Sequence, residues 1–431
     1  MIERYTRETF DKLWSEENKF TIWLEIELLA SEKMAQLGVI PKGAPARMRR
    51  NAKFSVDRIL EIERTTRHDV IAFITEVGRH LGKDEKYLHL GLTSSDVVDT
   101  AMSVRMRQAG LLLVDDVKSI TRRLAQLARK HVNTPIAGRT HGVFAEPTSL
   151  GLKFALWYAD LVRSRKRLQT AIETISVGKL SGSVGNFVHL DPRVESYVCR
   201  KLGLRPAPIS TQVIQRDRHA EFLFAVAALG AVAEKIAQEI RLLHRTEVGE
   251  LTEGFFAGQR GSSSMPHKKN PIICERICGL ARVLRGYVSA GLENVALWHE
   301  RDISHSSVER VIVPDATTAL DYMLHLLDSV IANLGIHPER MLENLTKWGQ
   351  PAFSQRLLLT LAERVGSRDK AYALVQQLAL KGAQDGSFRE LVLADPTIRE
   401  HMTEDEINEA FDLNHYLRHA HFVVRRALAI K

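Results

Sequence analysis

Long stretches without proline set the first limit on how this chain can fold. Four such stretches cover residues 46–134, 209–265, 272–313 and 352–395. Proline in a helix interior removes a backbone hydrogen bond and clashes with the preceding turn, so its absence leaves room for long helices. Strand-like alternation between turn signals is rare in the same stretches. We therefore expect an all-α protein.

The spacing of apolar residues supports this expectation. Between residues 20 and 34, apolar side chains dominate a stripe at helical spacing, and Gly38 and Pro41 follow as stop signals. The segment 220–243 is apolar on most faces over its first half, which indicates a helix buried all round. The centre of a helical bundle or a subunit interface would bury it.

Segments 101–131, 147–178 and 272–298 have a similar length, so we expect a bundle of long helices. Breaks near residues 91–100 and 366–369 divide the chain. They predict an N-terminal helical domain (1–95), a central long-helix bundle (96–364) and a small C-terminal helical domain (365–431). Within the last domain, Thr403 and Glu406 fit a capping box.

The net charge of +8 over 431 residues permits nucleic acid as a partner, but it suits anionic small molecules equally well. The densest basic cluster, residues 47–50, is short, and acidic residues are interspersed elsewhere, so no nucleic-acid partner is expected. The three cysteines, Cys199, Cys274 and Cys278, predict idle thiols rather than a disulfide framework. The N-terminus does not resemble a signal peptide, and the longest apolar run, residues 222–233, is shorter than the ~20 residues of a membrane span. We expect a cytoplasmic protein with no membrane partner.

Metal and phosphate motifs do not fit this sequence. Residues 258–268 lack the spacing of a P-loop, and His299 is followed by a histidine six positions on rather than four. His415, His419 and His421 could together form a metal site, but the favoured interpretation is that they lie on an exposed helix face. We expect no metal and no cofactor.

Four polar clusters stand near the ends of the expected helices: residues 66–69, 89–96, 138–147 and the loop 258–271, which is followed by Glu275. Loops at helix ends are where functional residues gather. Any one cluster alone is best explained as a cap or a turn. Their joint presence favours an active site.

The sequence GSSSMPHKKNP at residues 261–271 closely resembles the shared loop of the fumarase/aspartase superfamily. TSSD at 93–96 and GRTH at 138–141 resemble the other two shared regions. Within the superfamily, His267 and TRHDV at 66–70 resemble the adenylosuccinate lyase family. Argininosuccinate lyases usually carry glutamine at the position of His267, and fumarases and aspartases glycine or alanine.

The resemblance runs from Arg4 to about Arg310. It implies β-elimination of fumarate from adenylosuccinate and from succinyl-aminoimidazole-carboxamide ribotide. It also implies a homotetramer whose core is formed by the central long-helix bundle and whose active sites combine loops of three subunits. Some carboxymuconate cycloisomerases also carry MPHK, so that activity remains the alternative. A purely structural or nucleic-acid-binding role is disfavoured because Ser262, Lys268, His141 and Glu275 are all present.

The resemblance also implies roles for individual residues. Ser262 is the general base, His141 is the general acid with Glu275 as its partner, and His68 assists near the phosphate or the leaving nitrogen. Lys268 and Asn270 hold a substrate carboxylate. The remaining implied substrate contacts are Arg4, Tyr5, Arg67, Asp69, His89, Thr93, Ser94, Gln212, Ser263, Met265, Arg301, Ser306 and Arg310.

Overall fold

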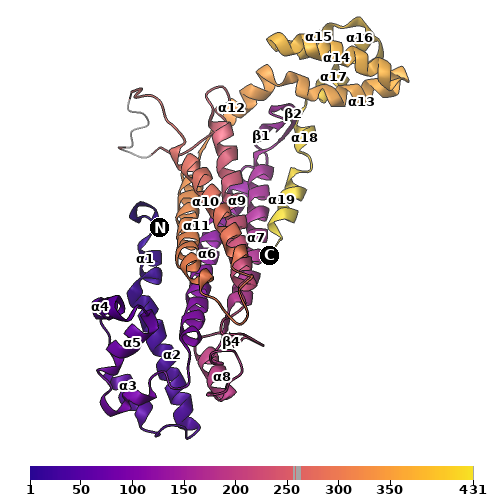
Figure 1. Ribbon diagram of the computed structural model, residues 1–431. Helices are drawn as coiled ribbons and strands as arrows, with labels where there is room; N and C mark the ends of the chain where they lie inside the picture. The colour runs from indigo at the N-terminus through magenta and orange to yellow at the C-terminus, as the bar shows by residue number, and fades with distance from the viewer. Residues whose placement is uncertain (256–257, 259–263, 431) are drawn as a thin grey trace. The chain divides into compact units, whose positions relative to one another are not determined.

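The computed structural model describes residues 1–255, 258 and 264–430, and these fold almost entirely as helices (Figure 1). In the described residues, strands occur only as short segments in three two-stranded sheets. The all-α prediction is confirmed. The homotetramer and the three domain boundaries stay predictions.

The chain forms two compact units, each assembled from three segments. The first unit comprises residues 1–117, 164–231 and 279–325, and the second comprises 118–163, 232–278 and 326–431. Five long helices contribute residues to both units: α6 (Ser94–Lys130), α7 (Leu150–Ile175), α9 (Asp217–His244), α10 (Ile272–Glu293) and α11 (Ser304–Ala332).

Helix α11 contains Pro314 in its interior. Proline in a helix interior usually kinks or breaks the helix. The structure shows that a single proline does not end this helix, because tertiary packing outweighs the loss of one backbone hydrogen bond.

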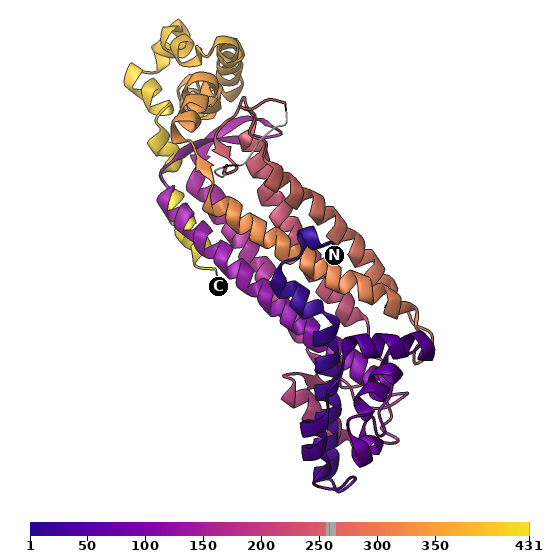
Figure 2. The same ribbon diagram turned by 90° about the vertical axis from the view of Figure 1, so that its left-hand side faces the viewer.

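The first unit carries the N-terminal helices. These are α1 (Glu8–Trp14), α2 (Glu16–Gln36), α3 (Ala44–Asn51), α4 (Val56–Thr66) and α5 (Asp69–Gly78), with 3₁₀ turns at Glu3–Tyr5 and Gly82–Tyr87. Helices α3, α4 and α8 (Pro192–Lys201) pack against α2 (Figures 1 and 2). The predicted stripe of α2 is confirmed, since Phe20, Trp23, Leu28 and Met34 are buried. Strands β3 (Val177–Gly178) and β4 (Arg205–Pro206) pair in parallel.

The second unit contains the hairpin β1 (Pro135–Thr140) and β2 (Val143–Ser149), and the pair β5 (Leu251–Thr252) and β6 (Gly335–Ile336). Its C-terminal part is helical: α12 (Pro338–Glu343), η3 (Asn344–Trp348), η4 (Gln350–Phe353), α13 (Ser354–Val365), α14 (Arg368–Asp385), α15 (Phe388–Ala394), α16 (Pro396–His401), α17 (Glu404–Ala410), α18 (Leu413–Leu417) and α19 (Ala420–Leu428). The predicted capping box of Thr403 and Glu406 begins α17.

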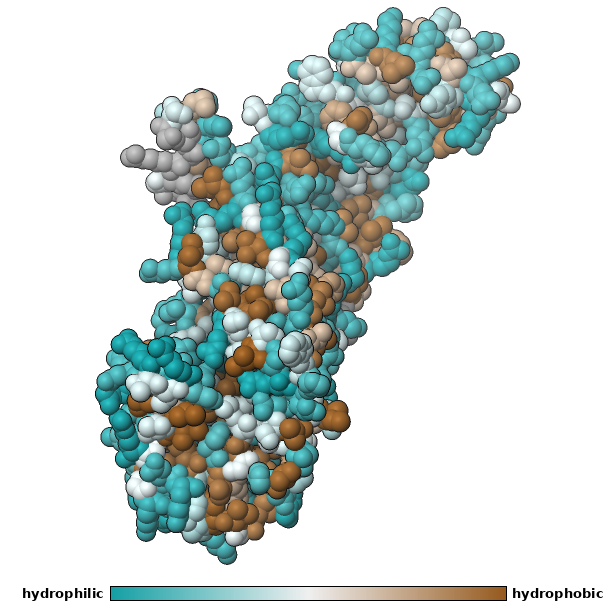
Figure 3. Space-filling view, viewed as in Figure 1, coloured by the Kyte–Doolittle hydropathy of each residue, from teal (hydrophilic) through white to brown (hydrophobic). Residues whose placement is uncertain are grey.

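Helix α9 is buried along most of its apolar first half, as predicted, but not all round. Phe222, Val226 and Leu229 are fully covered, whereas Phe224 is 54% exposed. Apolar side chains reach the molecular surface in many places (Figure 3). The three cysteines are free and buried, as predicted. Among the described residues, no helix combines the length and apolar character needed to cross a membrane.

Candidate functional site

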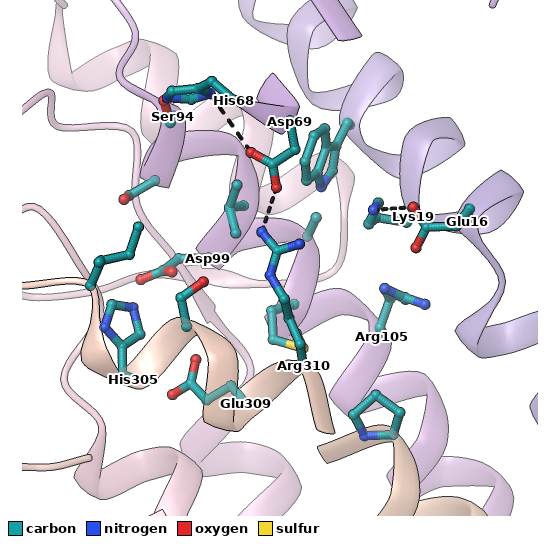
Figure 4. Close-up of a pocket in the computed structure, with 18 of the residues that line it drawn as sticks. Glu16, Lys19, His68, Asp69, Ser94, Asp99, Arg105, His305, Glu309 and Arg310 are labelled. Atoms are coloured by element: carbon teal, nitrogen blue, oxygen red, sulfur yellow. Dashed lines mark hydrogen bonds and ion pairs between the residues drawn. The ribbon is translucent and has the colours of Figure 1, made fainter. Parts of the chain in front are cut away.

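A pocket of about 360 Å³ lies within the first unit (Figure 4). Its lining combines the end of α4, the start of α5, the first turns of α6 and the first half of α11. Seven of the residues implied by the sequence resemblance line it: Arg67, His68, Asp69, Ser94, Arg301, Ser306 and Arg310. Two of the four polar clusters, 66–69 and 89–96, therefore meet residues 301–310 in one cavity.

His68 is held in a defined orientation at the start of α5. It is the N-cap residue of that helix, and its Nδ1 accepts a hydrogen bond from the backbone N–H of Ile71 at 3.4 Å. In the neutral ring this leaves the proton on Nε2, which lies 3.5 Å from the hydroxyl of Ser94. His68 can thus offer a proton or a hydrogen bond to a ligand beside Ser94.

Asp69 and Arg310 form an ion pair at the pocket, at 2.5 Å (Figure 4). Burial alone would raise the pKa of Asp69, but Arg310 and the backbone N–H of Val70 hold it below its usual value. Asp69 is largely buried, whereas about half of the Arg310 side chain is exposed. The guanidinium of Arg310 therefore keeps a free face for an anion.

A buried ionic triad forms one wall of the pocket, and sequence reasoning missed it. Arg216 donates to both oxygens of Asp99, at 2.6 and 3.0 Å, and to both oxygens of Glu309, at 2.9 and 3.1 Å. Burial opposes ionisation, but Arg216 brings the pKa of Asp99 down to about 2. Arg216 belongs to no motif in the sequence, so only the fold reveals it.

Two histidines beside the triad are uncharged near neutral pH. Burial, and then the charge of Arg216, lower the pKa of His305, which lines the pocket. The same two causes bring the pKa of fully buried His219 to about 3. His305 therefore adds no positive charge to the pocket, and the lining arginines supply it.

Three other implied residues lie outside the pocket lining. Gln212 accepts a hydrogen bond from Arg301 at 2.9 Å, and the Thr93 N–H donates to Asp96. His89 contacts Glu27 at 2.6 Å through Nδ1. Burial would lower the pKa of His89, but the bond and charge of Glu27 raise it overall. The ring of His89 is thus held by α2.

Arg4 and Tyr5 also lie outside the pocket lining, in the short N-terminal turn. The ring of Tyr5 packs on that of Tyr322, with centroids 5.3 Å apart, and Arg4 is exposed. Arg7 fixes this segment to α11 by donating to Asp321 at 2.8 Å.

Asp321 makes this anchor sensitive to pH. Burial raises the pKa of Asp321 to about 7, and neighbouring Asp116 adds to the rise against the opposing pull of Arg7. An acid in the unfolded chain has a pKa near ~3.9. The folded state therefore binds the proton more tightly, and its stability falls as pH rises from ~4 to about 7.

We accordingly expect Asp321→Asn to raise the melting temperature, and to raise it more at pH 8 than at pH 5, because the asparagine needs no proton. Thermal unfolding of both proteins from pH 5 to pH 8 measures the effect. The exposed-site variant Asp11→Asn serves as control. A melting-temperature difference that does not change with pH would rule out this role for Asp321.

In the second unit, His141 stands at the tip of the β1–β2 hairpin. His141 and Gly142 have φ angles of 55° and 79° between the paired residues Thr140 and Val143, which is the geometry of a two-residue type I′ turn. The sequence interpretation saw a helix-end loop here and missed the hairpin, because strand pairing depends on contacts beyond the local sequence. Arg139 anchors the hairpin by donating to both oxygens of buried Glu250, at 2.7 and 2.8 Å.

Ser262 and Ser263 lie outside the described residues. Met265 and Lys268 are exposed, and Asn270 is half-buried. Glu275 is exposed in the first turn of α10. The carboxylate of Glu253, which sequence reasoning also missed, accepts from the N–H groups of Ile273 and Cys274 and so fixes the start of that helix.

Comparison with known proteins adds a second, independent line of argument. A family model described as "Lyase" matches residues 3–286, and one described as "Adenylosuccinate lyase C-terminus" matches residues 352–427. Adenylosuccinate lyases of Bacillus subtilis (strain 168) and Thermotoga maritima are each 48% identical to this chain over 427 residues, which is 99% of this chain and 99% of each relative.

Solved structures share the fold at lower identity. Fumarate lyase from Mesorhizobium sp. BNC1 superposes with a TM-score of 0.91 at 26% identity, over 100% of both chains. The 3-carboxy-cis,cis-muconate lactonizing enzyme from Pseudomonas putida superposes with a TM-score of 0.89 at 26% identity, over 99% of this chain and 97% of that one.

Proposed function

This chain belongs to the adenylosuccinate lyase family of the fumarase/aspartase superfamily, and we propose that it removes fumarate from adenylosuccinate by β-elimination to leave AMP. We propose the same cleavage for succinyl-aminoimidazole-carboxamide ribotide, so that the enzyme acts twice in purine nucleotide biosynthesis. The chain is a lyase, and the proposal concerns its substrates and the residues that act on them.

The observation that carries the proposal is the composition of the pocket in the first unit. Both substrates bring a phosphate and two carboxylates. Arg301 and Arg310 suit the phosphate, because a planar guanidinium forms paired hydrogen bonds with its oxygens. Ser306, on α11, lies between Arg301 and Arg310 in the sequence and adds a hydroxyl donor. Ser94 and His68 offer further hydrogen-bonding groups in the same pocket.

The reaction begins with removal of a weakly acidic proton from the carbon beside a carboxylate. We assign this step to Ser262, whose hydroxyl needs a nearby cation and a dry surrounding to act as a base. Negative charge then builds up on that carboxylate. Lys268 and Asn270 stabilise it with an ammonium and an amide donor.

The departing nitrogen must then receive a proton. We assign this step to His141, because an imidazole can deliver a proton near neutral pH. Glu275 orients the ring, and His68 supports the phosphate end or the leaving nitrogen. The nitrogen leaves with the electron pair of the broken C–N bond, and the added proton keeps the departing group neutral.

Active sites shared between copies of the chain are part of the proposal. The pocket is formed by the first unit, whereas His141, Lys268 and Glu275 belong to the second. Large apolar side chains on the long helices support association into a homotetramer. Leu292 on α10 and Val311 on α11 are 58% and 53% exposed, which is costly unless another surface covers them.

A carboxymuconate cycloisomerase is the second candidate, favoured by the close superposition on the muconate enzyme. The higher identity to adenylosuccinate lyases and the arginine-rich pocket support the nucleotide substrate instead. The deciding experiment is a spectrophotometric assay of the purified protein with adenylosuccinate and, separately, with a carboxymuconate. Turnover of adenylosuccinate alone is expected. No turnover at micromolar enzyme would reject the proposal, and turnover of the carboxymuconate alone would establish the alternative.

A further inference from the structure

Lys179 is a fully buried lysine in the first unit, directly after β3. Its side chain is 0% exposed, as is that of its partner Asp96. An ammonium group has three protons to donate, and all three are used: to Asp96 at 2.7 Å, to the Gln212 carbonyl at 2.9 Å and to the Gly182 carbonyl at 3.0 Å.

Asp96 is held by as many contacts as its partner. Besides the ammonium, its carboxylate accepts hydrogen bonds from the backbone N–H groups of Thr93 at 2.8 Å, Ser181 at 3.0 Å and Gly182 at 3.3 Å. The backbone of Lys179 is fixed as well, because Thr100 on α6 accepts from its N–H and donates to its carbonyl. The pair therefore joins the start of α6 to the segments around residues 182 and 212.

The energetics indicate that stability alone does not explain this pair. Desolvating two charges costs several kcal/mol for each ion, and well-packed apolar side chains of similar volume are often at least as stabilising. What apolar side chains cannot supply is the set of directed bonds to backbone groups from three segments. The gain from the ion pair lies in fixing those segments relative to one another.

The segments that it fixes carry residues of the proposed site. Thr93 directly precedes α6, and Ser94 begins that helix and lines the pocket. Gln212 accepts from Arg301, another lining residue, and donates to the Ser183 carbonyl. We propose that Lys179 and Asp96 act as a positioning pair, which holds Thr93, Ser94 and Gln212 in the arrangement that binds the succinyl end of the substrate. This inference rests on the proposed function.

The test is the double variant Lys179→Met/Asp96→Asn, which removes both charges together and leaves neither one buried alone. With adenylosuccinate as substrate, we expect KM and the fumarate inhibition constant to rise by roughly 10–100-fold, because small displacements of binding groups cost this much. The value of kcat should fall by less than KM rises. A melting temperature below that of the parent with unchanged KM and fumarate inhibition would show a structural role only and overturn the proposal.

The matched control is Arg47→Met/Asp84→Asn. It removes an ion pair with two 2.8 Å hydrogen bonds, and neither of its residues lines the pocket. Its KM should equal that of the parent. If the first variant does not fold, Asp96→Asn alone decides the question, since it keeps the shape of the side chain. A parental KM in Asp96→Asn would then overturn the proposal.

A parent protein that does not cleave adenylosuccinate would reject the proposed function rather than the positioning pair. Amide hydrogen exchange then tests the positioning pair independently of catalysis. Faster exchange at Thr93, Ser181 and Gly182 in the variant, but not in the Arg47/Asp84 control, supports the pair. Unchanged exchange at these amides overturns it.

Discussion

Ser262→Ala is expected to lower kcat for adenylosuccinate by about 10²–10⁴-fold while KM stays close to that of the parent. The hydroxyl acts on the proton that moves in the transition state, so its loss should affect the barrier far more than ground-state binding. His141→Ala should behave in the same way, because it removes the proton donor. Steady-state kinetics with measured fumarate release checks both expectations.

Ser264→Ala is the control for the loop, since it removes a hydroxyl two positions from the proposed base and should keep most of the activity. A near-parental rate in Ser262→Ala would reject serine as the base. The two inactive variants also test whether sites are shared. Mixing them should restore part of the activity if Ser262 and His141 of one site come from different copies. No recovery after demonstrated subunit exchange would count against shared sites.

Arg216→Met is expected to destabilise the folded protein by roughly 3–5 kcal/mol, the usual result of removing one partner from a buried ion pair. Asp99 and Glu309, which it now bonds to, would stay buried without a cation. Without Arg216 their pKa values should rise, because the largest opposition to the effect of burial would be gone. The two carboxyl groups would then take up protons on folding, and the stability deficit should grow as pH rises.

Denaturant unfolding of Arg216→Met at pH 5 and pH 8 measures this deficit. Arg193→Met is the contrasting control, because it removes an exposed ion pair with Asp191 and should change stability little. The triple variant Asp99→Asn/Arg216→Met/Glu309→Gln should recover part of the loss at pH 8, since no buried charge remains. A small loss of unfolding free energy in Arg216→Met that does not depend on pH would show that the triad does not support the pocket wall.

The fold class followed from local signals in the sequence. Helical spacing at residues 20–34 and the long proline-free stretches act within a few turns of chain, and the structure confirms them in α2 and the long helices. The hairpin that carries His141 was missed, because strand pairing depends on residues whose register only tertiary contacts set. The proline-free stretches likewise did not indicate that α11 continues through Pro314, since packing around this helix is not a local property.

The residues of the pocket divide in a similar way. Arg67, His68, Asp69 and Ser94 stand in two recognisable polar clusters, Arg310 was implied by the family resemblance, and the structure brings them into one cavity. Arg216, Asp99 and Lys179 gave no signal, because an isolated arginine, aspartate or lysine in a sequence is most often a solvated surface residue.

By itself, the sequence determined that the chain is helical, and it showed which loops resemble those of a lyase. Both signals depend only on residues that are close together in the chain. The tertiary structure alone decided which charges are buried together. Arg216 bonds to Asp99 and Glu309, which are 117 and 93 positions away, and Lys179 bonds to Asp96, 83 positions away. A pair buried away from water persists only where the fold supplies hydrogen bonds that offset the cost of desolvation, and no local pattern encodes that condition.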